Sequence, residues 1–382
     1  MWYETEAARA ADPLTGRNII RWTHSPAKDQ HLYFTSPSVT ADDRWLIFLS
    51  ERDGHPNLYA IDRPAGRIRQ LTRNTAGTLR AYCYPFGGET GLSKPTASLD
   101  PINRRAFAIV DDQVIRAELD TGEAAALAAL PERGMTAFTH TSPDGRWLCL
   151  PLATPIEPFL EPAGTQGEQM HRLWPHIAAG RLRTRLWLID TETGAAHVWA
   201  ELPFWVTHIQ FHPTDPGRAI FNSEGHWQHQ AEIPRIWRID ADGNAHSLFD
   251  QTAPERCGHE NWAADGSAVI YHGDDGRGHY LARRDWEGNL LERLDVADLA
   301  VHHATPDATG RGYYVDCHDG IIYHIVGEGP SRRISTICRH DSGDPHDQDN
   351  HAHPILTPSG RSIIFTSTRA GTADVYEVLL GG

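Results

Sequence analysis

The segment Thr141-Ser142-Pro143-Asp144-Gly145-Arg146 has the composition of a tight turn, and variants of it recur along the whole chain. Pro, Asp and Ser favour the early positions of such turns, and Gly tolerates the left-handed backbone that often ends them. The other copies span residues 40–44, 100–104, 212–218, 263–267, 305–307 and 357–361. A turn that recurs at this spacing indicates an internal structural repeat.

Apolar segments flank each turn and predict short strands. The clearest unit continues after its turn with Trp45–Ser50, Asn57–Asp62 and Arg67–Thr72. Seven units of about 40–60 residues, each with four short strands, predict an all-β fold: a seven-bladed β-propeller that occupies residues 1–382 as a single domain. The expected blades span residues 36–72, 96–130, 137–200, 205–250, 257–295, 300–338 and 350–380. Residues 18–23 are expected to close the ring as a strand beside residues 375–378.

The charge balance excludes some classes of partner. The 35 basic and 50 acidic residues give a formal net charge of −15. This charge disfavours binding to nucleic acid or to an anionic membrane surface through bulk electrostatics. An acidic substrate would therefore need local positive charge inside a cleft. No particular oligomeric state is indicated.

Cysteine usage and the N-terminus bear on the compartment. The five cysteines are an odd number without a Cys-x-x-Cys spacing, which is typical of reduced thiols. The first sixteen residues contain no apolar signal-peptide core, and no apolar run is long enough to span a bilayer. We expect a cytoplasmic protein.

The segment Gln348-x-x-His351-x-His353-Pro354 combines an amide oxygen with two imidazoles. Borderline divalent metals such as manganese, iron and zinc accept this donor set. On an extended strand, His351 and His353 would point to the same face. The alternative is a histidine-rich loop without a ligand.

The repeat places further histidines at the same height. His208, His259 and His353 each stand four residues before the Ser/Thr-equivalent position of the turn in their own blade. In blade six this position is Val301, and His302 and His303 follow it. Four consecutive blades thus offer imidazoles to the central channel. Gln348, His351, His353 and one blade-six histidine would make a four-ligand metal site, whereas channel histidines bound only to water are the alternative.

Several longer motifs carry a resemblance. They are Asp12-Pro13-Leu14-Thr15-Gly16, residues 208–216, Glu224-Gly225-His226, residues 234–237, residues 259–267 and the Gln348 segment. In these motifs the chain resembles the oligogalacturonate lyases, a family of seven-bladed propeller enzymes that act on short pectin fragments. The resemblance implies a divalent cation, most often Mn²⁺, held by Gln348, His351, His353 and a blade-six histidine. His302 fits the family pattern His-x-x-[Ser/Thr], and His303 is the alternative.

The resemblance also implies catalytic and substrate-binding roles. His259 falls on the position of the base, Arg235 on that of a substrate-clamping arginine, and His208 is expected to contact substrate. Glu260, next to the base, is expected to orient its neighbours or to be solvated, because strand neighbours point to opposite faces.

The expected reaction is β-elimination from a short uronate oligosaccharide, which makes the protein a carbon–oxygen lyase. The base removes the C5 proton, which is only weakly acidic because the adjacent carboxylate must take up further negative charge, and the metal stabilises that charge. A guanidinium such as Arg235 suits a carboxylate. The alternatives are a lyase for another acidic glycan, such as a rhamnogalacturonan fragment, and a non-enzymatic scaffolding propeller.

Overall fold

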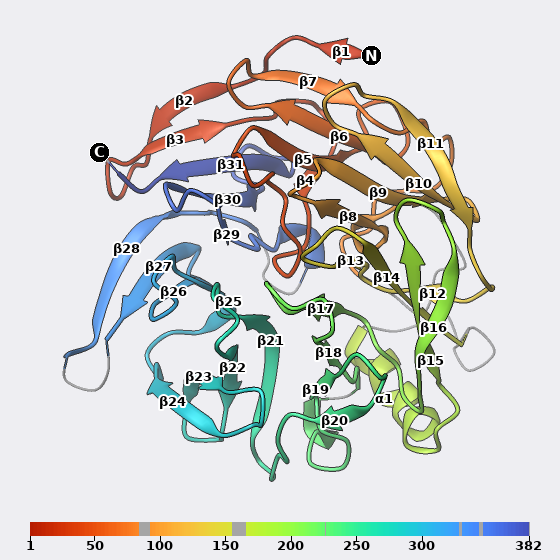
Figure 1. Ribbon diagram of the computed structural model, residues 1–382. Coiled ribbons are helices and arrows are strands. Elements are labelled where there is room, and N and C mark those ends of the chain that lie inside the picture. Colours follow the sequence, from red (N-terminus) through yellow and green to blue (C-terminus); the bar gives the residue numbers. More distant parts are fainter. Residues whose placement is uncertain (84–91, 155–165, 226, 328–330, 344–346, 382) are drawn as a thin grey trace.

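Seven antiparallel sheets follow one another round a central axis (Figure 1). They are the sheets of a computed structural model that describes residues 1–83, 92–154, 166–225, 227–327, 331–343 and 347–381. In each sheet the strands are paired mainly in sequence order, as a short repeat with tight turns requires. The predicted seven-bladed β-propeller is confirmed.

The first three sheets are formed by the N-terminal half. Blade one contains β4 (Asp29–His31), β5 (Trp45–Ser50), β6 (Asn57–Asp62) and β7 (Arg67–Gln70), with β1 (Trp2–Tyr3) outermost. Blade two contains β8 (Ala97–Asp100), β9 (Arg105–Val110), β10 (Gln113–Glu118) and β11 (Ala124–Ala129). Blade three contains β12 (Met135–Thr136), β13 (His140–Thr141), β14 (Trp147–Ala153), β15 (Thr184–Asp190) and β16 (Ala196–Leu202).

The remaining sheets complete the ring. Blade four contains β17 (Ile209–Phe211), β18 (Ala219–Asn222), β19 (Ile236–Ile239) and β20 (Ala245–Ser247). Blade five contains β21 (Arg256–Trp262), β22 (Val269–Asp274), β23 (His279–Arg284) and β24 (Leu290–Asp295). Blade six contains β25 (Val301–Pro306), β26 (Tyr313–Cys317), β27 (Ile321–Val326) and β28 (Arg333–Arg339). Blade seven contains β29 (Ile355–Leu356), β30 (Ser362–Ser367), β31 (Asp374–Leu379), β3 (Asn18–Arg21) and β2 (Ala8–Ala11).

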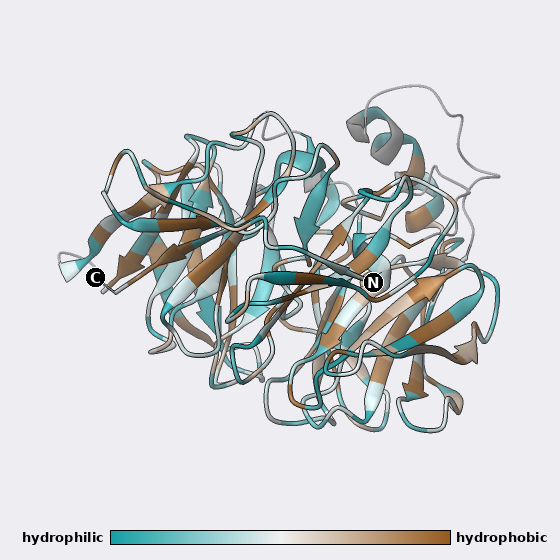
Figure 2. Cartoon of the chain, turned by 90° about the horizontal axis from the view of Figure 1, so that it is seen from above, coloured by the Kyte–Doolittle hydropathy of each residue, from teal (hydrophilic) through white to brown (hydrophobic). Residues whose placement is uncertain are grey.

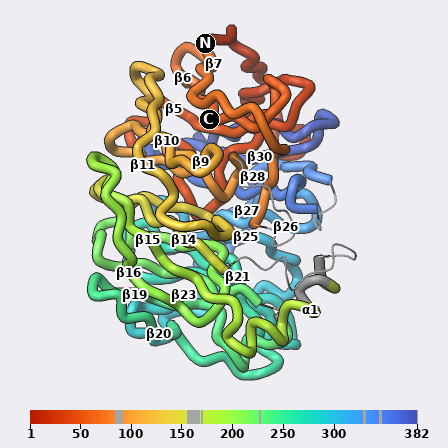
Figure 3. The backbone as a smooth tube through the Cα atoms, turned by 90° about the vertical axis from the view of Figure 1, so that its right-hand side faces the viewer, coloured from red at the N-terminus to blue at the C-terminus, as the bar shows by residue number. Residues whose placement is uncertain are grey.

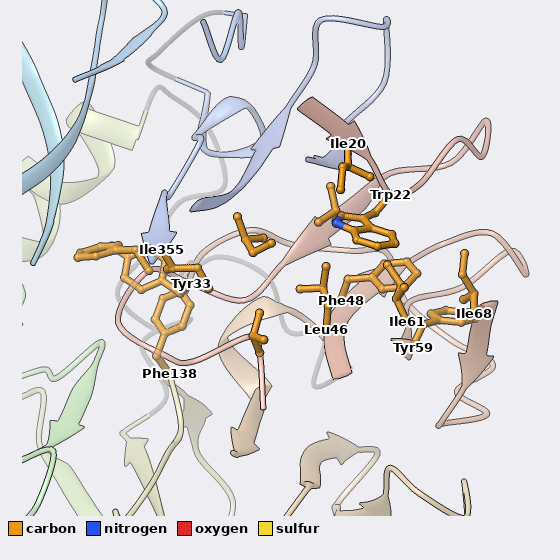
Figure 4. Close-up of a cluster of buried hydrophobic side chains, with 14 of the residues drawn as sticks. Ile20, Trp22, Tyr33, Leu46, Phe48, Tyr59, Ile61, Ile68, Phe138 and Ile355 are labelled. Carbon is orange, nitrogen blue, oxygen red and sulfur yellow. The ribbon is translucent and has the colours of Figure 1, made fainter. Parts of the chain in front are cut away.

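The first and last blades are joined by strands from the two ends of the chain. β3 pairs with β31, with Ile19 opposite Val378, which is the pairing expected of the closing strand. Ile20 and Trp22 pack into a buried cluster with Leu46 and Phe48 (Figure 4). The N-terminal segment therefore joins blade seven to the core of blade one.

Blade one begins earlier than expected. Its innermost strand, β4, starts at Asp29 rather than at residue 36. Past the end of β4, Tyr33 and Phe34 are buried, and the ring of Tyr33 stacks on Phe138 of blade three at 4.2 Å. Figure 4 shows Tyr33 beside Phe138 and Ile355, which come from other blades. This segment thus occupies the central channel instead of forming the expected inner strand.

Apolar packing between neighbouring blades forms the core. One cluster joins Trp45 and Ile47 of blade one to Leu99 and Ala106 of blade two. Figure 2 shows apolar residues along the strands and polar residues in most loops. Burial of such faces is the main driving force for this fold.

A helix interrupts blade three between β14 and β15. In α1 (Gln166–Ala178), Leu173 and Ile177 pack against Leu182 and Trp205. Figure 3 shows α1 lying to one side of the propeller. No helix in the described part of the chain has the length and apolar character that a bilayer span requires.

We expect the closing strand to contribute strongly to stability. Ile20 is 5% exposed, so Ile20→Ala should lower the free energy of unfolding by about 2–5 kcal/mol, because it leaves a cavity in the joint core. Ile102→Ala, at a side chain that is 59% exposed, should change it by less than about 0.5 kcal/mol. Urea denaturation measures both. A cost for Ile20→Ala as small as that of the control would contradict a closing role.

Buried histidines should make the protein acid-labile. Burial lowers the pKa of His31 to about 3, of His140 to about 4 and of His208 to about 3. The unfolded chain takes up these protons near pH 6.5, whereas the folded protein does not. The stability that these three imidazoles contribute is therefore fully present above pH 6.5 and is lost as the pH falls, by at most about 4 kcal/mol per pH unit for the three together.

Urea denaturation between pH 7.5 and 5, with a chelator present, measures this dependence. His140→Gln should reduce the slope by about one proton, and His197→Gln, at an exposed histidine, should leave it unchanged. A free energy of unfolding that stays constant over this range would show that the three imidazoles are not held neutral.

Candidate metal centre

Histidines from blades five, six and seven meet at the central axis. The ring centroids of His302 and His351 are 4.1 Å apart, and those of His303 and His353 are 4.4 Å apart. His259 of blade five lies 4.4 Å from His303. We call these five residues, His259, His302, His303, His351 and His353, the histidine cluster. The sequence predicted this convergence, but not its geometry.

A β-bulge in β25 directs two consecutive histidines to the cluster. Val301 pairs with Cys317 and His303 with Asp316, so His302 is an extra residue without a partner in the ladder. In a regular strand the two side chains would point to opposite faces, whereas a bulge breaks this alternation. The two imidazoles stack with centroids 4.3 Å apart. Both His302 and His303 therefore lie at the cluster, and the structure does not single out one of them.

Three of the imidazoles have the spacing of metal ligands. Ligand nitrogens of His302, His303 and His351 all lie within 4.8 Å of one another. A divalent ion with bonds of about 2.1 Å holds its ligand nitrogens within about 4.2 Å of one another, so the triangle would close on binding. Nε2 of His303 is buried and has no hydrogen-bond partner among the described residues, which fits an atom reserved for an ion.

Asp316 fixes the orientation of His303. Nδ1 of His303 lies 3.0 Å from one carboxylate oxygen of Asp316 and 3.1 Å from the other, and the backbone N–H of His303 donates to the same carboxylate at 2.8 Å. Burial alone would raise the pKa of Asp316, but the charge and hydrogen bond of His303 hold it well below its usual value. A carboxylate on Nδ1 leaves Nε2 as the nitrogen that can ligate.

Gln348 and His351 are linked by a short helix. Gln348 begins η5 (Gln348–Asn350), whose N-terminus is capped by the Asp347 side chain. The backbone N–H of His351 donates to the carbonyl of Gln348 at 3.4 Å. Residues 351–354 are irregular, so the expectation that His351 and His353 share one face of a strand is wrong. The helix, rather than strand alternation, places His351 near the cluster.

His353 is held in a strained conformation. Its φ of 48° lies in the left-handed region, which costs a non-glycine residue of the order of 1 kcal/mol. Nε2 of His31 lies 2.7 Å from the carbonyl of His353, and Nζ of Lys94 lies 3.0 Å from its Nδ1. Nε2 of His353 is buried without a partner among the described residues. His353 therefore lies beside the triangle of ligand nitrogens without being part of it.

His259 lies in a second β-bulge. Gly258 pairs with His272 and Asn261 with Ile270, so His259 and Glu260 together face a single residue of β22. His259 also has a left-handed φ of 52°, and its Nδ1 lies 2.8 Å from Nε2 of His272. Burial, followed by the charges of neighbouring histidines, lowers the pKa of His259 well below its usual value. A neutral imidazole is the form that accepts a proton.

Arg235 lies among acidic residues next to this bulge. It is 4% exposed, and its guanidinium is 3.4 Å from Glu260 and 3.6 Å from Glu224. Nε2 of His208 lies 3.5 Å from the same guanidinium, and Nδ1 of His208 is 3.4 Å from Glu260. Glu260 is fully buried, so it orients its neighbours as expected and is not solvated. Arg235 and His208 thus form a charged group beside the histidine cluster, not within its ligand triangle.

Sequence reasoning missed three residues of this region: Lys94, His272 and Asp316. Burial lowers the pKa of Lys94 to about 7. Asp316 pairs with His303 in its ladder, and His272 pairs with Gly258, the residue before His259. Only the strand register reveals these contacts. Lys94 comes from blade two, where the sequence has no histidine at the channel position.

Comparison with known proteins adds independent findings. No protein-family model matches the chain. An oligogalacturonide lyase of Pectobacterium atrosepticum is 24% identical, and the alignment covers 96% of this chain and 94% of that protein. An oligogalacturonate lyase structure from Vibrio parahaemolyticus matches with a TM-score of 0.81 at 21% identity, over 100% of this chain and 98% of that one.

A second solved structure, of an oligogalacturonate lyase in complex with manganese, matches equally well. Its TM-score is 0.81 at 22% identity, again over 100% of this chain and 98% of that one. These matches agree with the fold and with the resemblance that the motifs carry. Over nearly its whole length, the chain is a distant relative of the oligogalacturonate lyases.

Proposed function

We propose that the protein is a metal-dependent lyase that cleaves short oligogalacturonates by β-elimination. The observation that carries this proposal is the triangle of ligand nitrogens from His302, His303 and His351, with His259 adjacent to it. A metal-binding group next to a neutral imidazole is what removal of a proton α to a carboxylate requires. The similarity to oligogalacturonate lyases, including one in complex with manganese, supports the substrate and the metal.

The metal would be Mn²⁺, held by both blade-six histidines and His351. Gln348 and His353 are the further ligands in our proposal, because one begins the helix before His351 and the other has a buried nitrogen without a partner. Imidazole and amide donors suit this ion. When bound, the metal neutralises the substrate carboxylate and stabilises the charge that develops on it.

His259 would act as the base. It takes the C5 proton, the C5–H electrons form a double bond to C4, and the C4–O4 bond breaks. The departing oxygen is then protonated from solvent. His272 fixes the ring of His259 through Nδ1, and the bulge holds both residues in place. Such preorganisation keeps the base aligned with the proton that it removes.

Arg235 and His208 would contact the substrate. The contacts of Arg235 with Glu224 and Glu260 are longer than the roughly 2.7–2.9 Å of a tight charge-assisted hydrogen bond. A carboxylate of the oligosaccharide could replace one of them. All five cysteines are free and buried, which supports a reducing compartment, and we propose the cytoplasm.

Oligogalacturonate with Mn²⁺ should give the ultraviolet absorbance of an unsaturated uronate, and a chelator should abolish it. His259→Ala should lower kcat by at least about a hundredfold with unchanged metal content, because it removes the base but no ligand. His197→Ala, at an exposed histidine, is the control. Absence of product from oligogalacturonate and from rhamnogalacturonan fragments, despite bound metal, would contradict the lyase function. Loss of metal in His259→Ala would make His259 a ligand.

The hydrogen bond between Asp316 and His303 should tune metal affinity. Asp316→Asn should weaken Mn²⁺ binding by about 10–100-fold, because the amide no longer fixes the tautomer in which Nε2 is the ligand. Asp307→Asn is a matched control, since Asp307 contacts His324 at 3.1 Å and His324 is not in the histidine cluster. Calorimetric titration with Mn²⁺ measures both. Equal affinity in the two variants would show that Asp316 does not act through a ligand.

A further inference from the structure

Lysine is rare in this protein. The chain has 33 arginines but only two lysines, Lys28 and Lys94. The side chain of Lys28 is 42% exposed and forms an ion pair with Asp349. Lys94 is 1% exposed and lies at the start of η1 (Lys94–Thr96), directly before the innermost strand of blade two. One of the two lysines is therefore buried at the centre of the propeller.

The ammonium group of Lys94 forms no ion pair with a residue that the structure describes. Its only hydrogen bond within the described part of the chain is to Nδ1 of His353, at 3.0 Å, and no carboxylate oxygen there lies within 4.0 Å of Nζ. An ammonium has three donors, and a buried cation without a counter-charge is costly. Within the described residues, Lys94 therefore uses one of its three donors.

Other buried basic residues are compensated. Arg52 forms ion pairs with Glu6 and Asp29, and Arg63 forms one with Glu377. Arg235 lies between Glu224 and Glu260. The chain has 50 acidic residues, yet among the described residues only Asp349 acts on Lys94 through its charge, and it does so from beyond ion-pair distance.

The surroundings of Lys94 belong to the histidine cluster. Its contact residue, His353, has ring centroids 4.4 Å from His303 and 5.3 Å from His351. Its charge also acts on His31, the residue that holds the carbonyl of His353. An anion bound at Lys94 would therefore lie beside the metal ligands.

We propose that Lys94 binds a carboxylate of the acidic oligosaccharide next to the histidine cluster. The inference rests on the proposed function and adds a recognition residue to it. Lys94 adds no donor atom to the metal, because an ammonium group has no lone pair to offer.

The test separates uronate affinity from metal affinity. Trigalacturonate is titrated calorimetrically into Mn²⁺-saturated protein that carries His259→Ala, so that no turnover intervenes. When Lys94→Met is combined with His259→Ala, trigalacturonate binding should weaken by about 10–100-fold, because the substitution removes a charged hydrogen bond. Lys28→Met, the matched control at the other lysine, should change it less than twofold, and Lys94→Arg should restore part of the loss. Mn²⁺ affinity in Lys94→Met should be unchanged or higher.

Two outcomes would overturn the proposal: unchanged trigalacturonate affinity in Lys94→Met, or a parallel loss of Mn²⁺ and trigalacturonate affinity, which would make Lys94 a support of His353. Thermal denaturation checks folding, and Lys94→Gln replaces Lys94→Met if that variant unfolds. Absence of an unsaturated product from the wild-type protein would contradict the lyase function alone, because the titration does not depend on turnover.

Discussion

The pairing of β3 with β31 is the constraint on which the rest of the structure depends. An open ring of blades would leave an apolar face of its first and last blades uncovered. Here residues 18–21 add a strand to the last blade, between β31 and β2. Trp22 continues the joint, because its Nε1–H donates to Glu377 of β31 at 2.7 Å. Only a closed ring brings blades five, six and seven to one axis together with blade two, so the histidine cluster and Lys94 depend on this joint.

Local departures from strand geometry then shape the site. The bulges in β21 and β25 each add a residue at the channel, and His259 and His353 adopt left-handed backbone conformations. Such features cost stability and persist where the surrounding structure enforces them. Here they bring five imidazoles together, where regular strands would have turned some of them away.

The electrostatics of the centre would allow this acidic protein to bind the acidic sugar that we propose as its substrate. Arg235 is compensated by two glutamates, whereas no carboxylate among the described residues lies at contact distance from Lys94, and Asp316 contacts His303. A dication and one ammonium would make the centre locally positive, despite a net charge of −15. The charge that decides recognition is thus local.

The sequence by itself determined the seven-bladed fold, because turn chemistry and strand alternation are local properties that repeat along the chain. It also predicted that histidines of blades four to seven would gather at the channel. Those of blades five, six and seven meet there, while His208 lies beside them at Arg235. Tertiary structure alone decided that His302 and His303 lie side by side, that Asp316 contacts His303 and His272 contacts His259, and that Lys94 reaches His353 from 259 residues away. Bulges and contacts between blades depend on the register of strands distant in sequence, and no local pattern encodes that register.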